Sequence, residues 1–222
     1  ILNTMSRQIK FAKRYGKLLG NMDVDKNYPA FHFVYIIIFF ASENNAAFNL
    51  LLKNKNKMAI IHFIRMQVEC CLNVYACLMQ RDRDRFFKHI LDGKPINKLT
   101  IGKQYLTSGY LCGELDKRYS GISDIYKEGC KWVHPNKVIF RSTAPIMTSN
   151  NFHFIGYKGK EYCDDEEQRN DIYKDMLYVN QILYRLLKEL TIDYTNKNTK
   201  KVAYRIAQFV KSKRRINYKI YE

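Results

Sequence analysis

The stretch from residue 58 to about residue 79 constrains the fold most, because apolar residues occupy nearly every side of the helix that it predicts. Such a helix is stable in water only when neighbouring elements cover it all round. The sequence therefore places this helix in the middle of a helical bundle.

Helical patterning continues through most of the remaining chain. Helices are expected over residues 1–20, 30–53, 80–92, 100–119, 120–133, 164–190 and 199–214. The segments 137–143 and 151–157 are instead short, rich in β-branched and aromatic residues, and separated by a turn, which predicts a β-hairpin insert at about 137–157. We expect one domain over 1–222, an all-α helical bundle with a small inserted β-hairpin and a basic helix and tail at about 197–222.

The composition indicates a folded chain with no resident metal or cofactor. Hydrophobic residues make up 46% of the sequence, which is typical of a chain that buries a core. The six cysteines show no CxxC pair and no zinc-like spacing, so reduced thiols in a cytosolic protein are favoured over a metal or redox site. The apolar run 33–41 is about half the length needed to span a bilayer, which favours a core helix over a membrane anchor.

The positive charge is concentrated at the two ends of the chain. The chain has 38 Lys+Arg against 21 Asp+Glu, a formal net charge of +17. Residues 1–20 carry five Lys+Arg and residues 197–219 carry nine, with no acid in either segment. Aromatic residues are interleaved with the C-terminal cations, as on surfaces where nucleic-acid bases stack. The candidate nucleic-acid-binding residues are Lys200, Lys201, Arg205, Lys211, Lys213, Arg214 and Arg215. A basic surface without a dedicated partner and contact with an anionic membrane are the alternatives.

Two features could carry chemistry. Arg65 and Glu69 are four residues apart in the apolar helix, so they lie on one face, and we expect them to bond to each other and to a third polar group. They form either a buried ion pair that fixes helix register or a polar site inside the bundle. Lys127, Lys131 and His134 also share a helix face, at a helix C-terminus that stabilises an imidazolium. This set is either a capping histidine beside surface lysines or a site that faces phosphate.

The segments "IRMQVECCLNVYACL" and "YKEGCKWVHPN" resemble a group of uncharacterised bacterial helical proteins that are similar to the HEPN superfamily. The resemblance covers roughly residues 40–190 and implies a four-helix core that usually dimerises. Many HEPN proteins are metal-independent ribonucleases, often toxins of toxin–antitoxin pairs or anti-phage effectors. Their signature is an Arg followed after four to six residues by a His, and here the His corresponds to His134. No Arg precedes it at that distance; Lys127 is seven residues before it.

The resemblance implies a role for each candidate residue. His134 would act as general acid or base, Lys127 and Lys131 would stabilise charge on the phosphate, and no metal would be needed. The residues that would orient these groups are Arg65, Glu69 and Tyr126.

Three hypotheses for function follow. The first is a cytoplasmic HEPN-like protein that engages RNA, as a ribonuclease or as a binding relative, in bacterial stress or phage defence. The second is a non-catalytic module that forms a homodimer or holds a cognate protein partner. The third is a small-molecule sensor with a polar pocket lined by Arg65, Glu69 and tyrosines. A solvent-open cleft holding Arg65, Glu69 and His134 would favour the first, and their complete burial the second.

Overall fold

The computed structural model describes residues 2–23, 28–54, 56–133 and 166–194. The helices are α1 (Leu2–Asn21), α2 (Tyr28–Lys53), α3 (Lys57–Met79), α4 (Arg83–Leu91), the 3-10 turn η1 (Ile96–Lys98), α5 (Ser108–Asp116), α6 (Ile122–Val133) and α8 (Glu166–Ile192). The strands β1 (Thr100–Ile101) and β2 (Gln104–Tyr105) form one antiparallel hairpin. The described residues therefore form an all-α bundle with a small inserted hairpin. The predicted hairpin at 137–157, the predicted C-terminal helix and its basic residues lie outside them.

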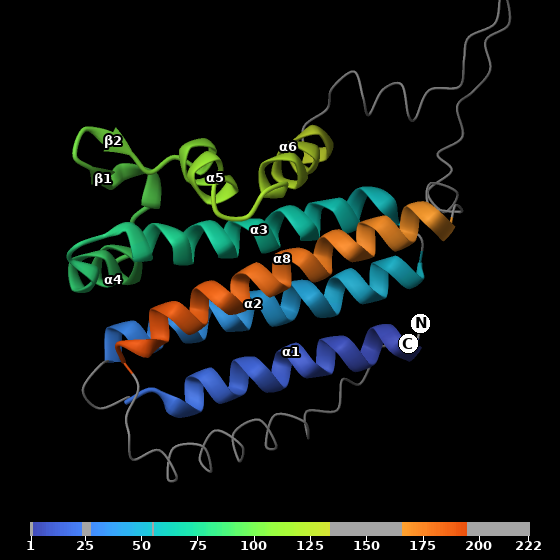
Figure 1. The fold of residues 1–222 in the computed structure, drawn as a ribbon, viewed down its shortest axis with the longest axis horizontal. Helices are drawn as coiled ribbons and strands as arrows, with labels where there is room; N and C mark the ends of the chain where they lie inside the picture. The colour runs from blue at the N-terminus through green and yellow to red at the C-terminus, as the bar shows by residue number, and fades with distance from the viewer. Residues whose placement is uncertain (1, 24–27, 55, 134–165, 195–222) are drawn as a thin grey trace, which may run out of the picture.

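Helix α3 is the centre of the molecule, as its sequence predicts. It packs against α2 and α8 on one side and against α5 and α6 on the other, and α4 covers its C-terminal end (Figure 1). Among the α3 side chains that the structure describes, only Met58 is exposed. Helix α1 completes the bundle by packing on α2 and α8.

Helix α1 is amphipathic, which confirms the prediction for this segment. Its buried stripe includes Phe11, Tyr15 and Leu18, whereas Lys13 and Lys17 are exposed. Burial of this stripe against α2 and α8 holds a strongly basic helix on the bundle.

A network of buried amides ties the inner helices together. Asn180 of α8 accepts hydrogen bonds through Oδ1 from Gln67 Nε2 of α3 (2.7 Å) and from Asn45 Nδ2 of α2 (3.0 Å). Asn180 Nδ2 donates back to Asn45 Oδ1 (2.7 Å), and the Tyr15 hydroxyl of α1 reaches Asn180 at 3.4 Å. Asn44 Nδ2 donates to Gln67 Oε1 (3.2 Å). Buried amides are stable only when they are paired in this way, so the network fixes the register of four helices.

Helix α2 belongs to this core although it is apolar along most of its length. By length and composition alone it could cross a membrane, with a mean hydropathy of 1.3 over 18 residues. However, 39% of that window is buried inside the protein, and Asn44 and Asn45 hold it to α3 and α8. We therefore interpret α2 as a core helix.

The sequence prediction for residues 100–119 is wrong in its first part. The structure places a hairpin there, with Ile101 opposite Gln104 and therefore a two-residue loop. Gly102 opens that loop at φ +60°, a conformation that favours glycine and matches the twist of a tight hairpin. The helix begins only at α5, where the Thr107 side chain accepts a hydrogen bond from the backbone N–H of Tyr110.

Candidate functional site

A polar cluster lies where α3 faces α5 and α6. Arg65 Nη2 lies 3.5 Å from Glu69 Oε1, and the Ser108 hydroxyl donates to Glu69 Oε2 at 3.4 Å. The guanidinium of Arg65 also lies over the ring of Tyr126, 5.5 Å from its centre. The expected pairing of Arg65 with Glu69 and with a third polar group is therefore confirmed, and the structure brings Tyr126 to the same place.

A glycine allows α3 and α6 to approach closely at this cluster. A Cβ atom at Gly129 would lie 2.7 Å from Cβ of Arg65, which is closer than such atoms pack. Sequence reasoning missed both Gly129 and Ser108. The glycine is a weak signal in itself, since the contact that explains it comes from a helix about 60 residues away.

The electrostatics of the cluster follow from its partial burial. Burial disfavours the charged form of Arg65, but hydrogen bonds to Tyr126 and Cys130 more than offset this and raise its pKa above the ordinary arginine value. Burial and then the charge of Glu69 raise the pKa of Tyr126. The side chains of Arg65 and Glu69 remain 24% and 31% exposed, so the pair is neither in an open cleft nor sealed in the core.

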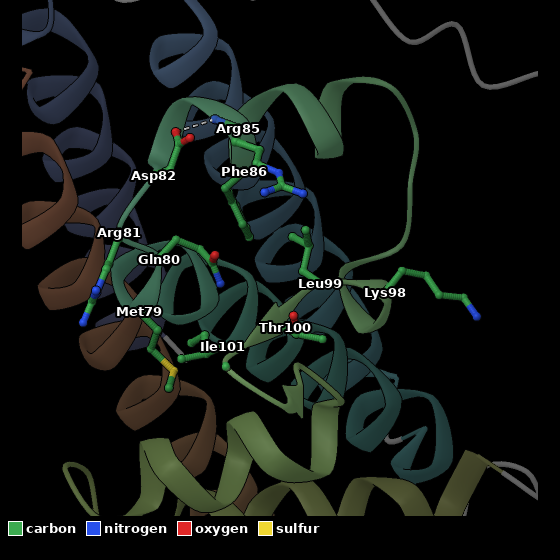
Figure 2. Close-up of a pocket in the computed structure, with 11 residues that line it drawn as sticks. Met79, Gln80, Arg81, Asp82, Arg85, Phe86, Lys98, Leu99, Thr100 and Ile101 are labelled. Atoms are coloured by element: carbon green, nitrogen blue, oxygen red, sulfur yellow. Dashed lines mark hydrogen bonds between the residues drawn. The ribbon is translucent and has the colours of Figure 1, made fainter.

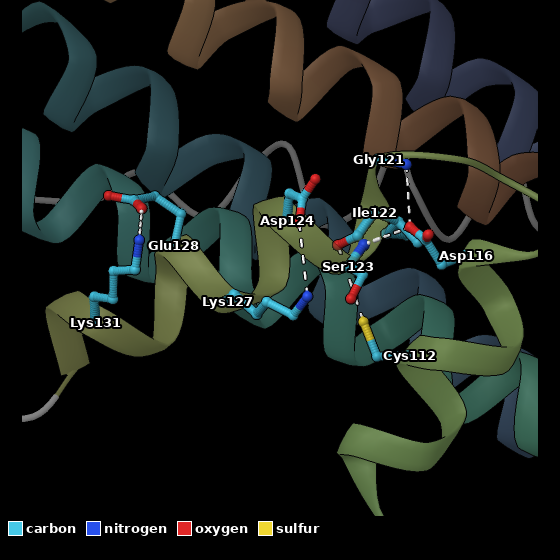
Figure 3. Close-up of polar contacts among 9 residues, drawn as sticks. All are labelled: Cys112, Asp116, Gly121, Ile122, Ser123, Asp124, Lys127, Glu128 and Lys131. Carbon is cyan, nitrogen blue, oxygen red and sulfur yellow. Dashed lines mark hydrogen bonds and ion pairs between the residues drawn. The ribbon is translucent and has the colours of Figure 1, made fainter.

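The predicted phosphate-facing lysines point to solvent and already have acidic partners (Figure 3). Lys127 Nζ lies 3.7 Å from Asp124 Oδ1, and Lys131 Nζ lies 2.8 Å from Glu128 Oε2. The structure does not bring these lysines into the Arg65–Glu69 cluster. His134 lies outside the described residues, directly after the end of α6.

The start of α6 is held by a carboxylate of the preceding helix. Asp116 Oδ1 accepts hydrogen bonds from the backbone N–H groups of Gly121 (3.0 Å) and Ser123 (2.9 Å), which Figure 3 also shows. Gly121 adopts φ +93°, so the tight turn between α5 and α6 depends on glycine at this position. The contact sets the direction in which α6 crosses α3.

Unpaired cations gather at the other end of α3. Residues 80–105 carry seven Lys+Arg against three Asp+Glu. Of the seven, Arg83 pairs with Asp193 and Lys94 with Asp92. The other five are exposed and have no carboxylate partner among the residues that the structure describes; they are Arg81, Arg85, Lys88, Lys98 and Lys103. We call these five the basic end. Sequence reasoning missed it, although the charge count was a usable signal.

A pocket of about 520 Å³ opens within the basic end (Figure 2). Arg81, Arg85 and Lys98 contribute its cations, and Phe86, Leu99 and Ile101 contribute apolar surface. The amide of Gln80 lies among these apolar side chains in Figure 2. Its Nε2 atom is buried and has no hydrogen-bond partner in the described part of the protein. This pocket differs in lining and position from the one that the sensor hypothesis predicts around Arg65 and Glu69.

The described cysteines are free thiols, and four of the five are buried. Burial raises the pKa of Cys70 to about 12, that of Cys77 to about 12 and that of Cys112 to about 11, so these thiols are protonated and unreactive near neutral pH. Within the described ranges, no group of three His, Cys, Asp or Glu side chains is placed to hold a metal ion.

The comparisons with known proteins do not identify the chain. No protein-family model, no curated protein and no solved structure matches it. The resemblance to HEPN proteins therefore stays a prediction from sequence.

Proposed function

We propose that this protein is a cytoplasmic, HEPN-like helical protein that binds RNA through its basic end. The observation that carries the proposal is the difference in how cations are used in two parts of the surface. Five exposed Lys and Arg of the basic end lack a carboxylate partner in the described structure. In residues 108–133, by contrast, all four cations are paired with acids.

Unpaired cations are the ones that contribute most to RNA binding. The RNA backbone carries a negative charge per nucleotide, and binding releases the counterions that surround it. A lysine that already contacts a carboxylate must give up that contact before it can neutralise a phosphate. The exposed Lys13 and Lys17 of α1 and the net charge of +17 add a general attraction for polyanions.

The first experiment measures the affinity for a fluorescently labelled single-stranded RNA by anisotropy, at 50 mM and 200 mM salt. With about five phosphate contacts, the affinity should fall about a hundredfold over this range. Absence of binding at 50 mM salt would refute the proposal.

A pair of triple variants tests whether the basic end is responsible. Arg81→Ala/Lys88→Ala/Lys103→Ala removes three unpaired cations, and Lys127→Ala/Lys131→Ala/Lys174→Ala removes three cations that contact acids. Both variants lose the same net charge. The first should weaken binding at least tenfold and reduce the slope of log affinity against log salt by about 2, whereas the second should change affinity less than threefold. Equal losses would show that net charge alone, and not the basic end, drives binding.

A second candidate function is a metal-independent ribonuclease centred on His134. One observation favours it: the Arg65–Glu69–Tyr126 cluster packs on the last turns of α6, the helix that leads directly to His134. His134 would take the proton from a 2′-hydroxyl, while Lys127 and Lys131 would leave Asp124 and Glu128 to stabilise the phosphate.

Cleavage of a labelled RNA pool in EDTA tests this candidate. The native protein is compared with His134→Ala and with His89→Ala, a matched change at the basic end. Cleavage that is lost only in His134→Ala would assign catalysis to His134. No cleavage by any of the three, with all of them folded, would exclude the ribonuclease and favour a non-catalytic module that dimerises or holds a protein partner.

A further inference from the structure

We propose that the pocket of the basic end binds a nucleotide through its phosphomonoester group, and that in an RNA strand this nucleotide is the phosphorylated terminus. The inference rests on the proposed function and names the part of the RNA that the site recognises. It is argued from the charge, the unpaired amide and the size of the pocket.

The charge of the pocket favours an anion. Arg81, Arg85 and Lys98 line it, although in Figure 2 the Arg81 and Lys98 side chains point away from its centre, and the only acid in its lining is Asp82. Asp82 Oδ1 accepts a hydrogen bond from the backbone N–H of Arg85 (3.0 Å) and caps α4, and its single charge is outnumbered by the cations of the lining. Figure 2 shows this hydrogen bond, with the Arg85 guanidinium reaching over the pocket from α4. A terminal phosphate carries more charge than a bridging one and can accept two parallel hydrogen bonds from an arginine.

The amide of Gln80 supplies a donor for which the described residues offer no acceptor. Gln80 is the C-cap of α3, and its backbone N–H bonds to the carbonyl of Cys77, so the direction of its side chain is set by the end of a buried helix. Its Nε2 atom is buried and has no partner among the residues that the structure describes, which is unfavourable in the free protein. A ligand oxygen placed in the pocket would satisfy it.

The size and apolar walls of the pocket require more than a phosphate ion. A volume of about 520 Å³ lies within the ordinary range for small-molecule sites, roughly 300–1,000 Å³. The side chains of Phe86, Leu99 and Ile101 offer apolar surface to the ligand. A sugar and a base would cover this surface while the phosphate meets the Arg85 guanidinium and the Gln80 amide.

The test compares four ligands with the full-length chain. Two are short RNAs of one sequence, with and without a terminal phosphate; the other two are adenosine monophosphate and adenosine. The phosphorylated RNA should bind at least fivefold more tightly than its unphosphorylated form, and adenosine monophosphate should bind where adenosine does not. Arg85→Ala should abolish both preferences, whereas Lys174→Ala, an exposed cation of α8 that pairs with Asp171 outside the basic end, should preserve them.

The variant Gln80→Met tests whether the Gln80 amide contributes to ligand binding independently of protein stability. The change keeps the size of the side chain and removes the unpaired donor, so the melting temperature without ligand should not fall, while the preference for the phosphorylated RNA should drop at least threefold. Gln104→Met, at an exposed position of the hairpin outside the pocket, is the matched control.

The outcomes distinguish the inference from the proposed function. RNA that binds equally well with and without a terminal phosphate, together with no binding of adenosine monophosphate, would overturn the inference and leave RNA binding intact. Binding of adenosine monophosphate without binding of either RNA would support the pocket as a site for free nucleotides and refute the proposed function. Preferences that survive Arg85→Ala would show that the phosphate is recognised elsewhere.

Discussion

The α5–α6 side of the molecule and the basic end use charge in opposite ways. On α5 and α6, acids stand three residues before Lys117, Lys127 and Lys131 and neutralise them on the same helix or at its end. At the basic end the acid Asp82 caps a helix instead, and its neighbours Arg81 and Arg85 have no carboxylate partner in the described part of the chain. The contrast shows that net charge alone does not tell which cations lack a carboxylate partner in the described structure, because that depends on how each carboxylate is used.

The two regions also differ in how closely they pack against α3. Helix α6 approaches α3 so closely that Gly129 leaves no room for a side chain beside Arg65. At the basic end, α4 and the hairpin leave a pocket beside the end of α3, with a buried amide for which the described residues offer no partner. Tight packing is typical of a structural contact, whereas an unfilled polar pocket is typical of a binding site.

The largest effect on stability is expected at the close contact between α3 and α6. Gly129→Ala should lower the free energy of unfolding by about 2 kcal/mol, since the added methyl overlaps Arg65 and the helices must separate. Gly113→Ala in α5 is the matched control, because a Cβ there meets no atom within 4 Å. It should raise stability by about 0.5–1 kcal/mol through helix propensity. Urea unfolding measures both, and a neutral Gly129→Ala would show that the two regions pack alike.

Helix α3 joins the two regions, and two of its thiols test whether burial or local charge determines a thiol pKa there. Cys70 lies near Glu69 and Cys77 near Arg83, charges of opposite sign, yet burial dominates and raises the pKa of each to about 12 from an ordinary value of 9.0. Above pH 9 the unfolded chain releases these protons while the folded chain keeps them, so stability falls as pH rises from 9 towards 12. Between pH 8 and pH 10 each thiol should lower the free energy of unfolding by about 1 kcal/mol.

The measurement compares urea unfolding at pH 8 and pH 10 for the native protein, Cys70→Ala and Cys77→Ala. The free energy of unfolding should fall less between pH 8 and pH 10 in each variant than in the native protein. The two variants should differ from the native protein by a similar amount, whatever their stability at pH 8. A clearly smaller reduction for Cys77→Ala would mean that the charge of Arg83 offsets burial at the C-terminal end of α3.

The sequence predicted those features that depend on local spacing. The apolar helix 58–79 was placed correctly at the centre of the bundle because few of its faces can tolerate water. Arg65 and Glu69 were paired correctly because residues four apart share a helix face. The prediction of helix for residues 100–105 is wrong because Gly102 adopts a positive φ and opens a two-residue hairpin loop there.

The features that the sequence did not predict depend on contacts between distant segments. The close approach at Gly129 requires knowledge of which helix faces it, and the pocket exists only where α4 and the hairpin meet the end of α3. The amide network was missed for the same reason, although Asn44, Gln67 and Asn180 stand out as polar residues in apolar surroundings. His134 and the predicted C-terminal nucleic-acid-binding residues stay predictions.

The smallest effect on stability is expected when single ion pairs are broken, and one pair near each end of α3 can be compared. Glu69→Gln removes the charge that faces half-buried Arg65, whereas Asp193→Asn removes the partner of Arg83, with a carboxylate side chain that is 59% exposed. We expect the free energy of unfolding to fall by about 1 kcal/mol for Glu69→Gln and by about 0.3 kcal/mol for Asp193→Asn, because solvent screens the more exposed pair. Glu69→Gln should also lower the pKa of Tyr126, which absorbance titration against Tyr126→Phe can follow. Equal losses that both disappear in 1 M salt would show that the Arg65 cluster is as open to water as the Arg83–Asp193 pair, and would remove the reason for treating the two regions differently.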